Sequence, residues 1–357
     1  MNGYKSEKCA VFRHRVCDFS VGRRSEFHSE TAQTPASTGI EKKGTGINMS
    51  KKGFILAHTE LDARMVERLK ESGLDLLGIH PGGGDGAAHL LDELLEYLKK
   101  PEFRSMLTEL EENGFEIEYE LHALNWLLPK SVLDCHGDWK RVNDQGERTD
   151  RYNFCVSADG VLDYISDRCY YLATQLKQKG HRYNIWIDDI KGGHCHCQRC
   201  ASLTPADQAL IFCRAALRGL RRYDPLASQS YLAYYDTLNV PENVPTEEGI
   251  FLEFAPIERW TKGTDNELKA VPALVKFFGA DTAKVLEYWV DNSLFSKWKK
   301  PPVKCVLDKE GMRRDVKLYR EAGFKDMTSF GLYLGAEHTE LHGEFSIREY
   351  AECFDTE

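Results

Sequence analysis

Residues 54–80 read FILAHTELDARMVERLKESGLDLLGIH, and this stretch decides the fold class. The short apolar run 54–58 predicts a strand, and the amphipathic segment 61–72 predicts a helix that stops at Gly73. The apolar run 76–80 then predicts a second strand. A strand, a helix and another strand in this order form the repeating unit of a parallel sheet.

The same alternation continues to the end of the chain. Further strands are predicted at residues 115–121, 183–187, 230–234, 250–254, 285–289 and 326–330. This pattern indicates the α/β class, and a single (β/α)8 TIM barrel is the simplest fold that accommodates it. A two-domain, doubly wound protein is the alternative. Because the active sites of such barrels lie on the loops after the strands, polar residues at strand ends become the candidates.

Residues 1–48 differ from the rest of the chain. They contain no leucine and carry eight Lys/Arg against five Asp/Glu. Such a segment cannot bury enough apolar surface to offset its ordering entropy, so we expect a disordered extension before a barrel domain at 49–357. A native start at Met49 is a further hypothesis.

Composition limits the classes of partner. The 357 residues carry a formal charge of −9, with an isoelectric point of about 5.8. An acidic balance argues against a nucleic-acid or anionic-membrane partner, and no apolar stretch is long enough to predict a membrane span. Because no signal-peptide core is evident, we expect a cytoplasmic protein whose eleven cysteines are reduced thiols or metal ligands. The sequence does not define the oligomeric state.

Two adjacent carboxylates, Asp188 and Asp189, follow the predicted strand 183–187. Successive side chains of a strand point to opposite faces, but this restriction relaxes where the chain breaks at residues 190–193. Two acids in one cleft would repel each other, which raises one pKa and leaves the other group ionised. We therefore expect a catalytic pair here. In the alternative interpretation, one aspartate caps a loop and the other faces solvent.

A cysteine-rich segment, GGHCHCQRC at residues 192–200, comes next. Its spacing brings Cys195, Cys197 and Cys200 into one loop, and three thiolates with a fourth ligand suit tetrahedral zinc. His194 completes the expected set, and the other candidates for the fourth ligand are His196, Cys155 and Cys135. A filled set of protein ligands predicts a closed, structural zinc site. The alternative is a group of buried reduced cysteines.

Aromatic and polar residues cluster at the other strand ends. Flat aromatic faces beside carboxylates and amides suit a carbohydrate, which has an apolar C–H face and a rim of hydroxyls. The candidates for substrate binding are His80, His122, Trp126, Trp186, Tyr235, Arg259, Tyr288 and Trp289. Glu287 or Glu258 could pair with Asp189 in a conventional two-carboxylate mechanism. For any single one of these residues, barrel packing is the alternative explanation.

The WIDD block at 186–189, followed by CHCQRC at 195–200, resembles the domain of unknown function 4838 family. Shorter matching pieces lie at residues 120–124, 153–157, 254–259, 286–289 and 330–331, so the resemblance spans about 54–354. It implies a TIM-barrel glycoside hydrolase similar to glycoside hydrolase family 163, whose members are endo-β-N-acetylglucosaminidases. It further implies a substrate-assisted retaining mechanism, in which Asp188 orients the 2-acetamido group and Asp189 protonates the leaving oxygen, or the reverse.

These observations support two hypotheses from different classes. The first is a glycoside hydrolase acting on a β-linked glycan that contains N-acetylhexosamine. The second is a zinc-braced barrel that binds a carbohydrate without cleaving it. A metal-dependent hydrolase with an open zinc site is a third and weaker alternative.

Overall fold

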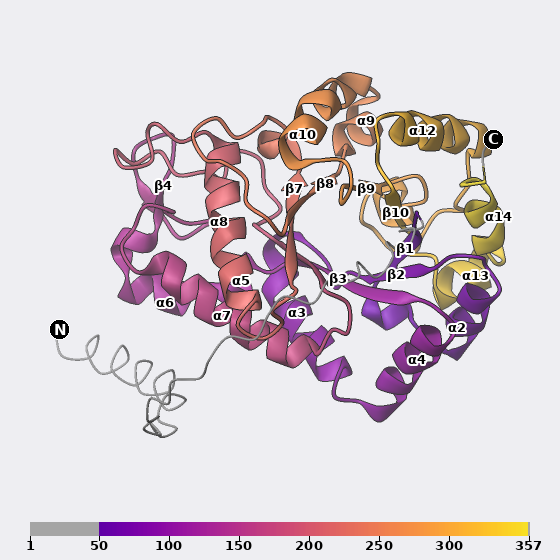
Figure 1. Cartoon of the computed structure of the whole chain (residues 1–357). Coiled ribbons are helices and arrows are strands. Elements are labelled where there is room, and N and C mark those ends of the chain that lie inside the picture. The colour runs from indigo at the N-terminus through magenta and orange to yellow at the C-terminus, as the bar shows by residue number, and fades with distance from the viewer. Residues whose placement is uncertain (1–49, 356–357) are drawn as a thin grey trace, which may run out of the picture. The chain divides into compact units, whose positions relative to one another are not determined.

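Eight parallel strands close into a barrel in the computed structural model, which describes residues 50–355 (Figure 1). The strands are β1 (Lys52–Leu56), β2 (Leu76–Ile79), β3 (Glu116–His122), β6 (Arg182–Trp186), β7 (Ser228–Ala233), β8 (Ile250–Phe254), β9 (Lys284–Glu287) and β10 (Asp326–Phe330). Their order around the barrel is β1-β10-β9-β8-β7-β6-β3-β2. The predicted (β/α)8 barrel is therefore confirmed, because a doubly wound sheet would stay open. The expected extension at residues 1–48 lies outside the described residues.

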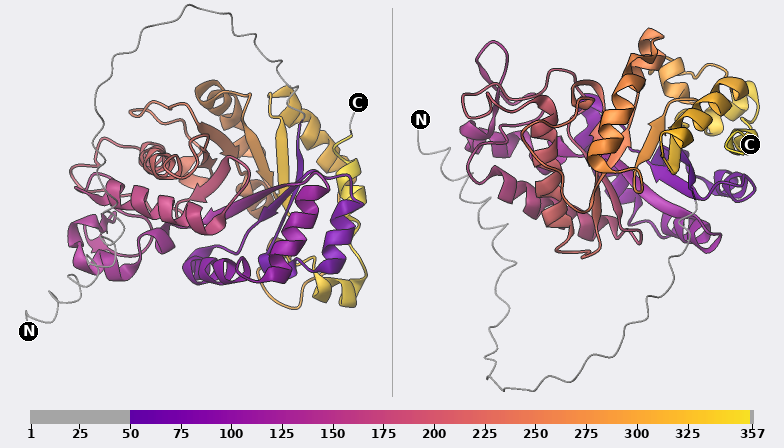
Figure 2. Two further views of the ribbon diagram at one scale, coloured as in Figure 1. Left: turned by 60° about the horizontal axis from the view of Figure 1, so that its bottom comes forward. Right: turned by 45° about the horizontal axis from the view of Figure 1, so that its top comes forward.

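Helices surround the strands on the outside of the barrel (Figure 2). The longer ones are α2 (Ala63–Lys70), α3 (Ala87–Tyr97), α4 (Pro101–Glu112), α7 (Val161–Leu176), α8 (Pro205–Leu220), α10 (Val271–Phe278) and α12 (Lys309–Glu321). The shorter ones are α5 (Leu124–Leu127), α6 (Lys130–Cys135), α9 (Ile257–Lys262), α11 (Asn292–Phe295), α13 (Ala336–His342) and α14 (Ile347–Glu352). Among the described residues, no helix combines the length and the apolar character needed to cross a bilayer.

The connection between β7 and β8 is the irregular part of the ring, since it carries only a 3₁₀ turn (Tyr235–Thr237). Asp207, in the first turn of α8, fastens this connection. Its Oδ1 accepts hydrogen bonds from the backbone N–H groups of Glu242 (2.9 Å), Asn243 (2.8 Å) and Val244 (3.1 Å). The same carboxylate forms a capping box with Thr204, so one side chain both starts α8 and holds the loop.

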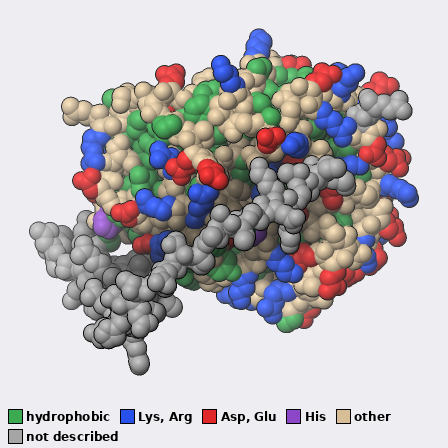
Figure 3. Space-filling view, viewed as in Figure 1, with side chains coloured by type: hydrophobic (Ala, Val, Ile, Leu, Met, Phe, Trp, Pro, Cys, Tyr) green, Lys and Arg blue, Asp and Glu red, His purple; other side chains and the backbone are tan. Residues whose placement is uncertain are grey.

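Two loops that follow β3 and β6 extend the barrel on one side. The first contains a small antiparallel pair, β4 (Arg141–Val142) and β5 (Arg148–Thr149). The second contains the cysteine-rich segment, and the N–H of His196 donates to the carbonyl of Val142 over 2.8 Å. These two loops therefore form one substructure beside the mouth of the barrel. On the face shown in Figure 3, basic and acidic side chains lie interspersed.

A charged cluster fills the middle of the barrel. The Nζ of Lys284 on β9 contacts three buried glutamates: Glu118 (2.8 Å), Glu253 (3.1 Å) and Glu120. Although burial opposes the charge on Lys284, these carboxylates raise its pKa above the ordinary value. Burial and the neighbouring Glu253 also raise the pKa of Glu120, so the cluster carries less negative charge than its formula suggests.

We predict that Lys284→Met lowers the free energy of unfolding by about 3–5 kcal/mol, because it leaves buried carboxylates without their cation. Urea unfolding followed by circular dichroism measures this change. The matched control is Lys325→Met, which removes an exposed ion pair with Asp281 and should cost less than about 1 kcal/mol. Equal, small losses in both variants would contradict a structural role for the cluster.

Candidate functional site

The carboxyl ends of the strands open into a cleft of about 980 Å³. Residues from or just after all eight barrel strands line it, which is where TIM barrels carry their active sites. Its volume is at the upper end of the usual range for small-molecule sites. Trp186, Leu286, Tyr288 and Phe330 belong to one buried apolar cluster and form the inner wall of the cleft.

Seven of the residues that the sequence singled out line this cleft. They are His80, His122, Trp186, Asp189, Tyr235, Glu258 and Tyr288. The register explains part of the grouping, because β3 and β6 pair with His122 opposite Trp186. Their rings lie 4.9 Å apart in an edge-on arrangement. The indole N–H of Trp186 is held by Glu253 Oε2 (2.8 Å), so the charged cluster fixes the position of this aromatic ring.

The two histidines of the cleft are fixed by backbone carbonyls. Nδ1 of His80 lies 2.7 Å from the carbonyl of Glu120, and Nδ1 of His122 lies 2.8 Å from that of Ile187. Because a carbonyl only accepts, each Nδ1 carries a proton and donates it to this bond. Burial, with the nearby His122, lowers the pKa of His80 to about 4, so this ring is uncharged at neutral pH.

Asp189 places its carboxylate in the cleft. Its Oδ1 accepts a hydrogen bond of 2.9 Å from the hydroxyl of Tyr234, another cleft residue. The glycine-rich loop after β2 lies against it, since a Cβ at Gly83 would come within 2.9 Å of Oδ2. A glycine at this position therefore lets the loop approach the carboxylate.

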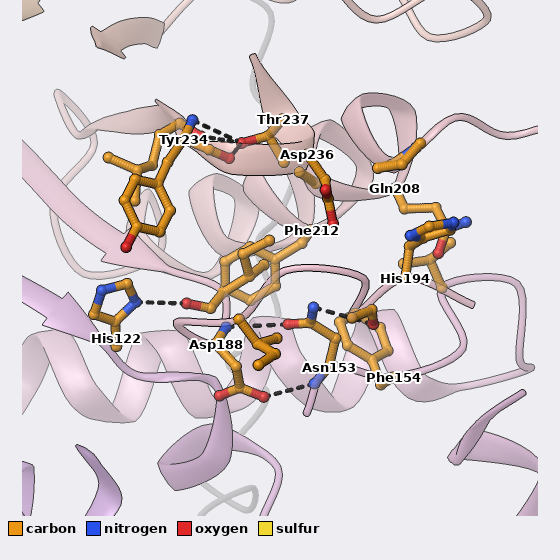
Figure 4. Close-up of a pocket in the computed structure, with 17 residues that line it drawn as sticks. His122, Asn153, Phe154, Asp188, His194, Gln208, Phe212, Tyr234, Asp236 and Thr237 are labelled. Carbon is orange, nitrogen blue, oxygen red and sulfur yellow. Dashed lines mark hydrogen bonds between the residues drawn. The ribbon is translucent and has the colours of Figure 1, made fainter. Parts of the chain in front are cut away.

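Asp188 lies on the other side of the chain and is only 5% exposed. Its Oδ2 accepts from the backbone N–H of Asn153 (2.6 Å), and its own N–H donates to Asn153 Oδ1 (3.0 Å) (Figure 4). It lines a separate cavity of about 40 Å³ and not the large cleft. The expected arrangement, with both carboxylates facing a common pocket, is therefore not what the structure has. After the strand ends, neighbouring side chains still leave the backbone on opposite sides.

Burial raises the pKa of Asp188 to about 6, against the hydrogen bond from the backbone of Asn153. The side chain of Asn153 also donates to the carbonyl of Gly193 (3.2 Å), beyond the turn. Asn153 thus binds the chain on both sides of Asp189. We describe this reciprocal pairing of Asn153 with Asp188 as the Asn153 clamp.

Four cysteine sulfurs, from Cys155, Cys195, Cys197 and Cys200, lie within 4.8 Å of one another and could hold a metal ion. The sulfur of Cys155 is 3.5 Å from that of Cys197 and 3.8 Å from that of Cys200. Four thiolates at about 2.3 Å from a tetrahedral zinc ion would lie about 3.8 Å apart. The geometry of the cluster is consistent with zinc.

The fourth member of this cluster is Cys155, and the expected fourth ligand, His194, is not part of it. The His194 ring packs 4.2 Å from that of His196 and lines the smaller cavity. Cys155 comes from the loop after β3, whereas the other three cysteines follow β6. The cluster therefore joins two loops, and Asn153 of the clamp lies two residues before Cys155.

Four other expected site residues face away from the cleft. Glu287 is fully buried and accepts from Arg259 Nη1 (2.9 Å), and Arg259 also donates to Asp315 of α12 (3.0 Å). The indole of Trp289 donates to the same aspartate (3.1 Å). On β9 and its extension, alternate positions face the interior, so Glu287 and Trp289 point to the outer helices. Trp126 bonds to Asp92 on α3.

The structure adds cleft residues that the sequence interpretation did not select. Glu60 follows β1, and the rule that strand-end polar residues are candidates would have included it. Trp298 and Lys300 also line the cleft, but they lie too far beyond β9 for strand spacing to find them. Three cleft aromatics have left-handed backbones: Tyr235 (φ 48°), Trp298 (φ 55°) and Tyr333 (φ 64°). Such strained residues concentrate at functional sites.

No family model and no curated protein sequence matches the chain. Solved structures do resemble it. An N-acetyl-β-hexosaminidase of Streptomyces plicatus, in complex with Thio-NAglucal, aligns with a TM-score of 0.50 and 14% identity. The alignment covers 86% of this chain and 64% of the hexosaminidase, so the chain spans less than two thirds of that protein.

A second similar structure is the endo-glycoceramidase II of Rhodococcus sp., with a TM-score of 0.44, 12% identity and coverage of 79% and 72%. A third is a catalytic module of the pneumococcal exo-β-D-N-acetylglucosaminidase, with a TM-score of 0.47, 10% identity and coverage of 86% and 84%. At these identities the likeness shows the fold alone. The chain is a TIM barrel that shares its fold with glycoside hydrolases.

We predict a pH-dependent effect of Asp188→Asn on stability. In the folded protein the pKa of Asp188 lies above its ordinary value of 3.8. The protonated carboxyl group therefore contributes fully to stability below about pH 3.8, and this contribution is lost as the pH rises through about 6. The variant cannot ionise. Relative to the wild type, its free energy of unfolding should therefore rise by about 2 kcal/mol between about pH 4 and pH 7.

Urea unfolding at several pH values gives this difference directly. The exposed Asp281→Asn provides the control and should show no such trend. A stability difference that stays constant with pH would mean that Asp188 does not titrate as a buried group.

Proposed function

We propose that the chain is a glycoside hydrolase that acts on a β-linked glycan containing N-acetylhexosamine, in the cleft around Asp189. The hydrogen bond between Tyr234 and Asp189, inside an aromatic-walled cleft at the carboxyl end of the barrel, is the observation that carries this proposal. The resemblance of the 186–200 region to glycosidase-like barrels and the fold of the similar hexosaminidase support it.

The chemistry of this pair suits an acetamido group. A carboxylate offers an acceptor for the amide N–H, and the adjacent phenol can turn its proton toward the amide oxygen. Burial raises the pKa of Tyr234 well above its ordinary value, so the hydroxyl keeps the proton that it donates. In a substrate-assisted reaction the amide oxygen attacks the anomeric carbon, and positive charge develops on the amide. A carboxylate at the N–H stabilises that charge.

The walls of the cleft suit the sugar ring. Trp186 and Tyr288 present buried aromatic surface at the inner wall, and Tyr235 lies nearer the rim. Such faces pack against the apolar C–H side of a pyranose. Nε2 of the uncharged His80 remains as an acceptor for sugar hydroxyls, and Nε2 of His122 offers a second polar atom to the same cleft.

In this proposal Asp188 and Asp189 have different roles from an adjacent catalytic pair. Asp189 contacts the substrate, and Asp188 is a positioning residue that acts through the Asn153 clamp. Glu287, at the barrel's outer side, holds Arg259 and so serves the fold. Of the two expected partners for Asp189 in a two-carboxylate mechanism, Glu258 lines the cleft and Glu287 does not.

A second candidate function is carbohydrate binding without cleavage. The observation that favours it is the burial of Asp188 away from the cleft, which leaves Asp189 without its expected neighbour. Under this alternative, the aromatic walls bind the glycan and no bond is broken. Measured turnover separates the two functions.

We further propose that the four-cysteine cluster holds one structural zinc ion. The four sulfurs fill a tetrahedral set, so the ion would brace the two loops and leave no position for water or substrate. The metal would act on the reaction only by holding the loops that carry Asn153 and Asp189.

We predict that Cys155→Ser lowers the zinc content from about one ion per chain to near zero and lowers the melting temperature. His194→Ala is the control and should keep its zinc. Elemental analysis of purified protein measures both. Retained zinc in the Cys155 variant, or lost zinc in the His194 variant, would contradict the ligand set. Chelation should reduce stability before it reduces turnover.

We predict that Asp189→Asn lowers kcat/KM on aryl N-acetyl-β-hexosaminides at least about 100-fold, because the neutral amide no longer stabilises the developing charge. The control, Asp265→Asn, changes an exposed carboxylate at the outer face and should behave as the wild type. Full activity in the Asp189 variant ends the proposed mechanism. Glycan binding by a wild type that releases no product would establish the binding alternative.

A further inference from the structure

Among residues 50–355, four carboxylates line the cleft, namely Glu60, Asp189, Glu258 and Asp291. Glu258 forms ion pairs with Lys191 (3.2 Å) and Lys262 (2.6 Å), and these hold its pKa below the ordinary value, with Lys262 the larger influence. A carboxylate in that state is a poor proton donor.

Asp291 is committed to local structure. Its Oδ1 accepts from the Ser293 hydroxyl (2.6 Å), the Ser293 N–H (3.1 Å) and the Leu294 N–H (3.2 Å). These bonds cap the short helix α11. With Asp189 proposed to contact the acetamido group, Glu60 is the remaining carboxyl group of the cleft.

Glu60 comes from the loop after β1 and is held only loosely. One oxygen receives the N–H of Ala57 at 3.4 Å and the other receives the N–H of Gly335 at 3.3 Å. Gly335 packs closely, since a Cβ there would lie 3.3 Å from Oε1. Both hydrogen bonds are long, so they tether the carboxyl group without committing it.

The surroundings of Glu60 include one charged side chain, Lys300, on the loop after β9. That lysine is itself engaged, because its Nζ lies 2.5 Å from Glu337 and 4.2 Å above the ring of Tyr333. Burial raises the pKa of Glu60 to about 7, against the backbone hydrogen bonds from Gly335 and Ala57 and the weaker influences of Lys300 and the Tyr333 backbone. At neutral pH a large fraction of this group therefore carries a proton.

We propose that Glu60 is the catalytic general acid, which donates its proton to the leaving oxygen from the wall of the cleft away from Asp189. The inference rests on the proposed function, and it supplies the acid that Asp188 cannot supply from its buried position. On the shorter path around the barrel, β2 and β3 separate β1, which carries Glu60, from β6, which carries Asp189. The two groups thus approach a bound sugar from different sides.

In the proposed reaction one proton leaves Glu60 and one returns to it. The Glu60 proton passes to the glycosidic oxygen as the bond from that oxygen to the anomeric carbon breaks, and the leaving alcohol departs. The acetamido oxygen supplies the electron pair that forms a new bond to the anomeric carbon, giving a cyclic oxazolinium. Water then attacks that carbon and returns one proton to the Glu60 carboxylate. The sum is hydrolysis with retained configuration.

The test compares leaving groups in the full chain. A phenyl N-acetyl-β-hexosaminide needs a proton on its leaving oxygen, whereas the 2,4-dinitrophenyl compound does not. Glu60→Gln should lower kcat/KM for the phenyl compound by about 10²–10⁴-fold and leave the dinitrophenyl compound nearly unchanged. In the wild type, kcat/KM for the phenyl compound should fall as the pH rises through about 7. Glu60→Gln should abolish that fall.

Glu267→Gln is the matched control. Burial also raises the pKa of Glu267 to about 7, but it lies outside the cleft and accepts from the N–H of Arg259 (3.0 Å). This variant should keep the wild-type pH profile and leaving-group dependence. Thermal melts establish that both variants are folded. If Glu60→Gln does not fold, the pH dependence of kcat/KM in the wild type decides. A fall in kcat/KM near pH 7 for the phenyl compound, but not for the dinitrophenyl compound, supports Glu60 as the general acid.

The outcomes separate the two proposals. The wild type could be active while Glu60→Gln loses activity on both compounds equally, or still shows the fall in kcat/KM near pH 7. In either case Glu60 is not the acid and the proposed function stands. If only the wild type can be measured, a pH dependence of kcat/KM that is the same for both leaving groups overturns the inference. A wild type that hydrolyses neither compound overturns the proposed function and the role of Glu60 with it.

Discussion

The site depends on one reciprocal pair of hydrogen bonds, the Asn153 clamp. The side chain of Asn153 accepts from the backbone of Asp188, and its backbone donates to the Asp188 carboxylate. Each residue thereby satisfies a polar group of the other in a buried place, where an unmade hydrogen bond is costly. Because the clamp fixes Asp188 on one side of the chain, the next residue is turned toward the cleft. The position of Asp189 is thus set by groups that lie outside the cleft.

Two supports meet at this turn. From outside, the four clustered cysteines bring the loop after β3 against the loop after β6, and Asn153 lies two residues before Cys155 of this cluster. From inside, Lys284 gathers three glutamates in the barrel, and one of them, Glu253, bonds the indole of Trp186. The turn therefore lies between a buried ionic core and the loop that carries the cysteine cluster. A binding group on a loop gains the precision of a strand when both of its sides are held in this way.

The sequence predicted the barrel because its strands are apolar runs bounded by turn residues, and β8 and β10 were found at their exact residues. It could not say which way a strand faces. Both faces of a barrel strand are buried, one by the interior and one by helices. The sequence of a strand therefore does not show which of its side chains point into the barrel. Tyr288 and Trp289 looked equivalent, yet Tyr288 lines the cleft and Trp289 bonds to α12. Cys155 was one of several alternatives for the fourth metal ligand. Its proximity to Cys195 depends on how two loops meet in space, which the sequence does not show.

Glu60 and Glu267 have similarly raised pKa values but differ in how accessible their carboxyl groups are. Burial raises the pKa of Glu60 and of Glu267 to about 7, so both carry a proton readily at neutral pH. Glu267 does not line the cleft, and it accepts a hydrogen bond from the backbone N–H of Arg259. The side chain of Arg259 in turn bonds to Asp315 of α12. Glu60 lines the open cleft, and its hydrogen bonds from the N–H groups of Ala57 and Gly335 are long. A perturbed pKa indicates a function only where a reacting atom can approach the proton, and the strand ends of the barrel are where that approach exists.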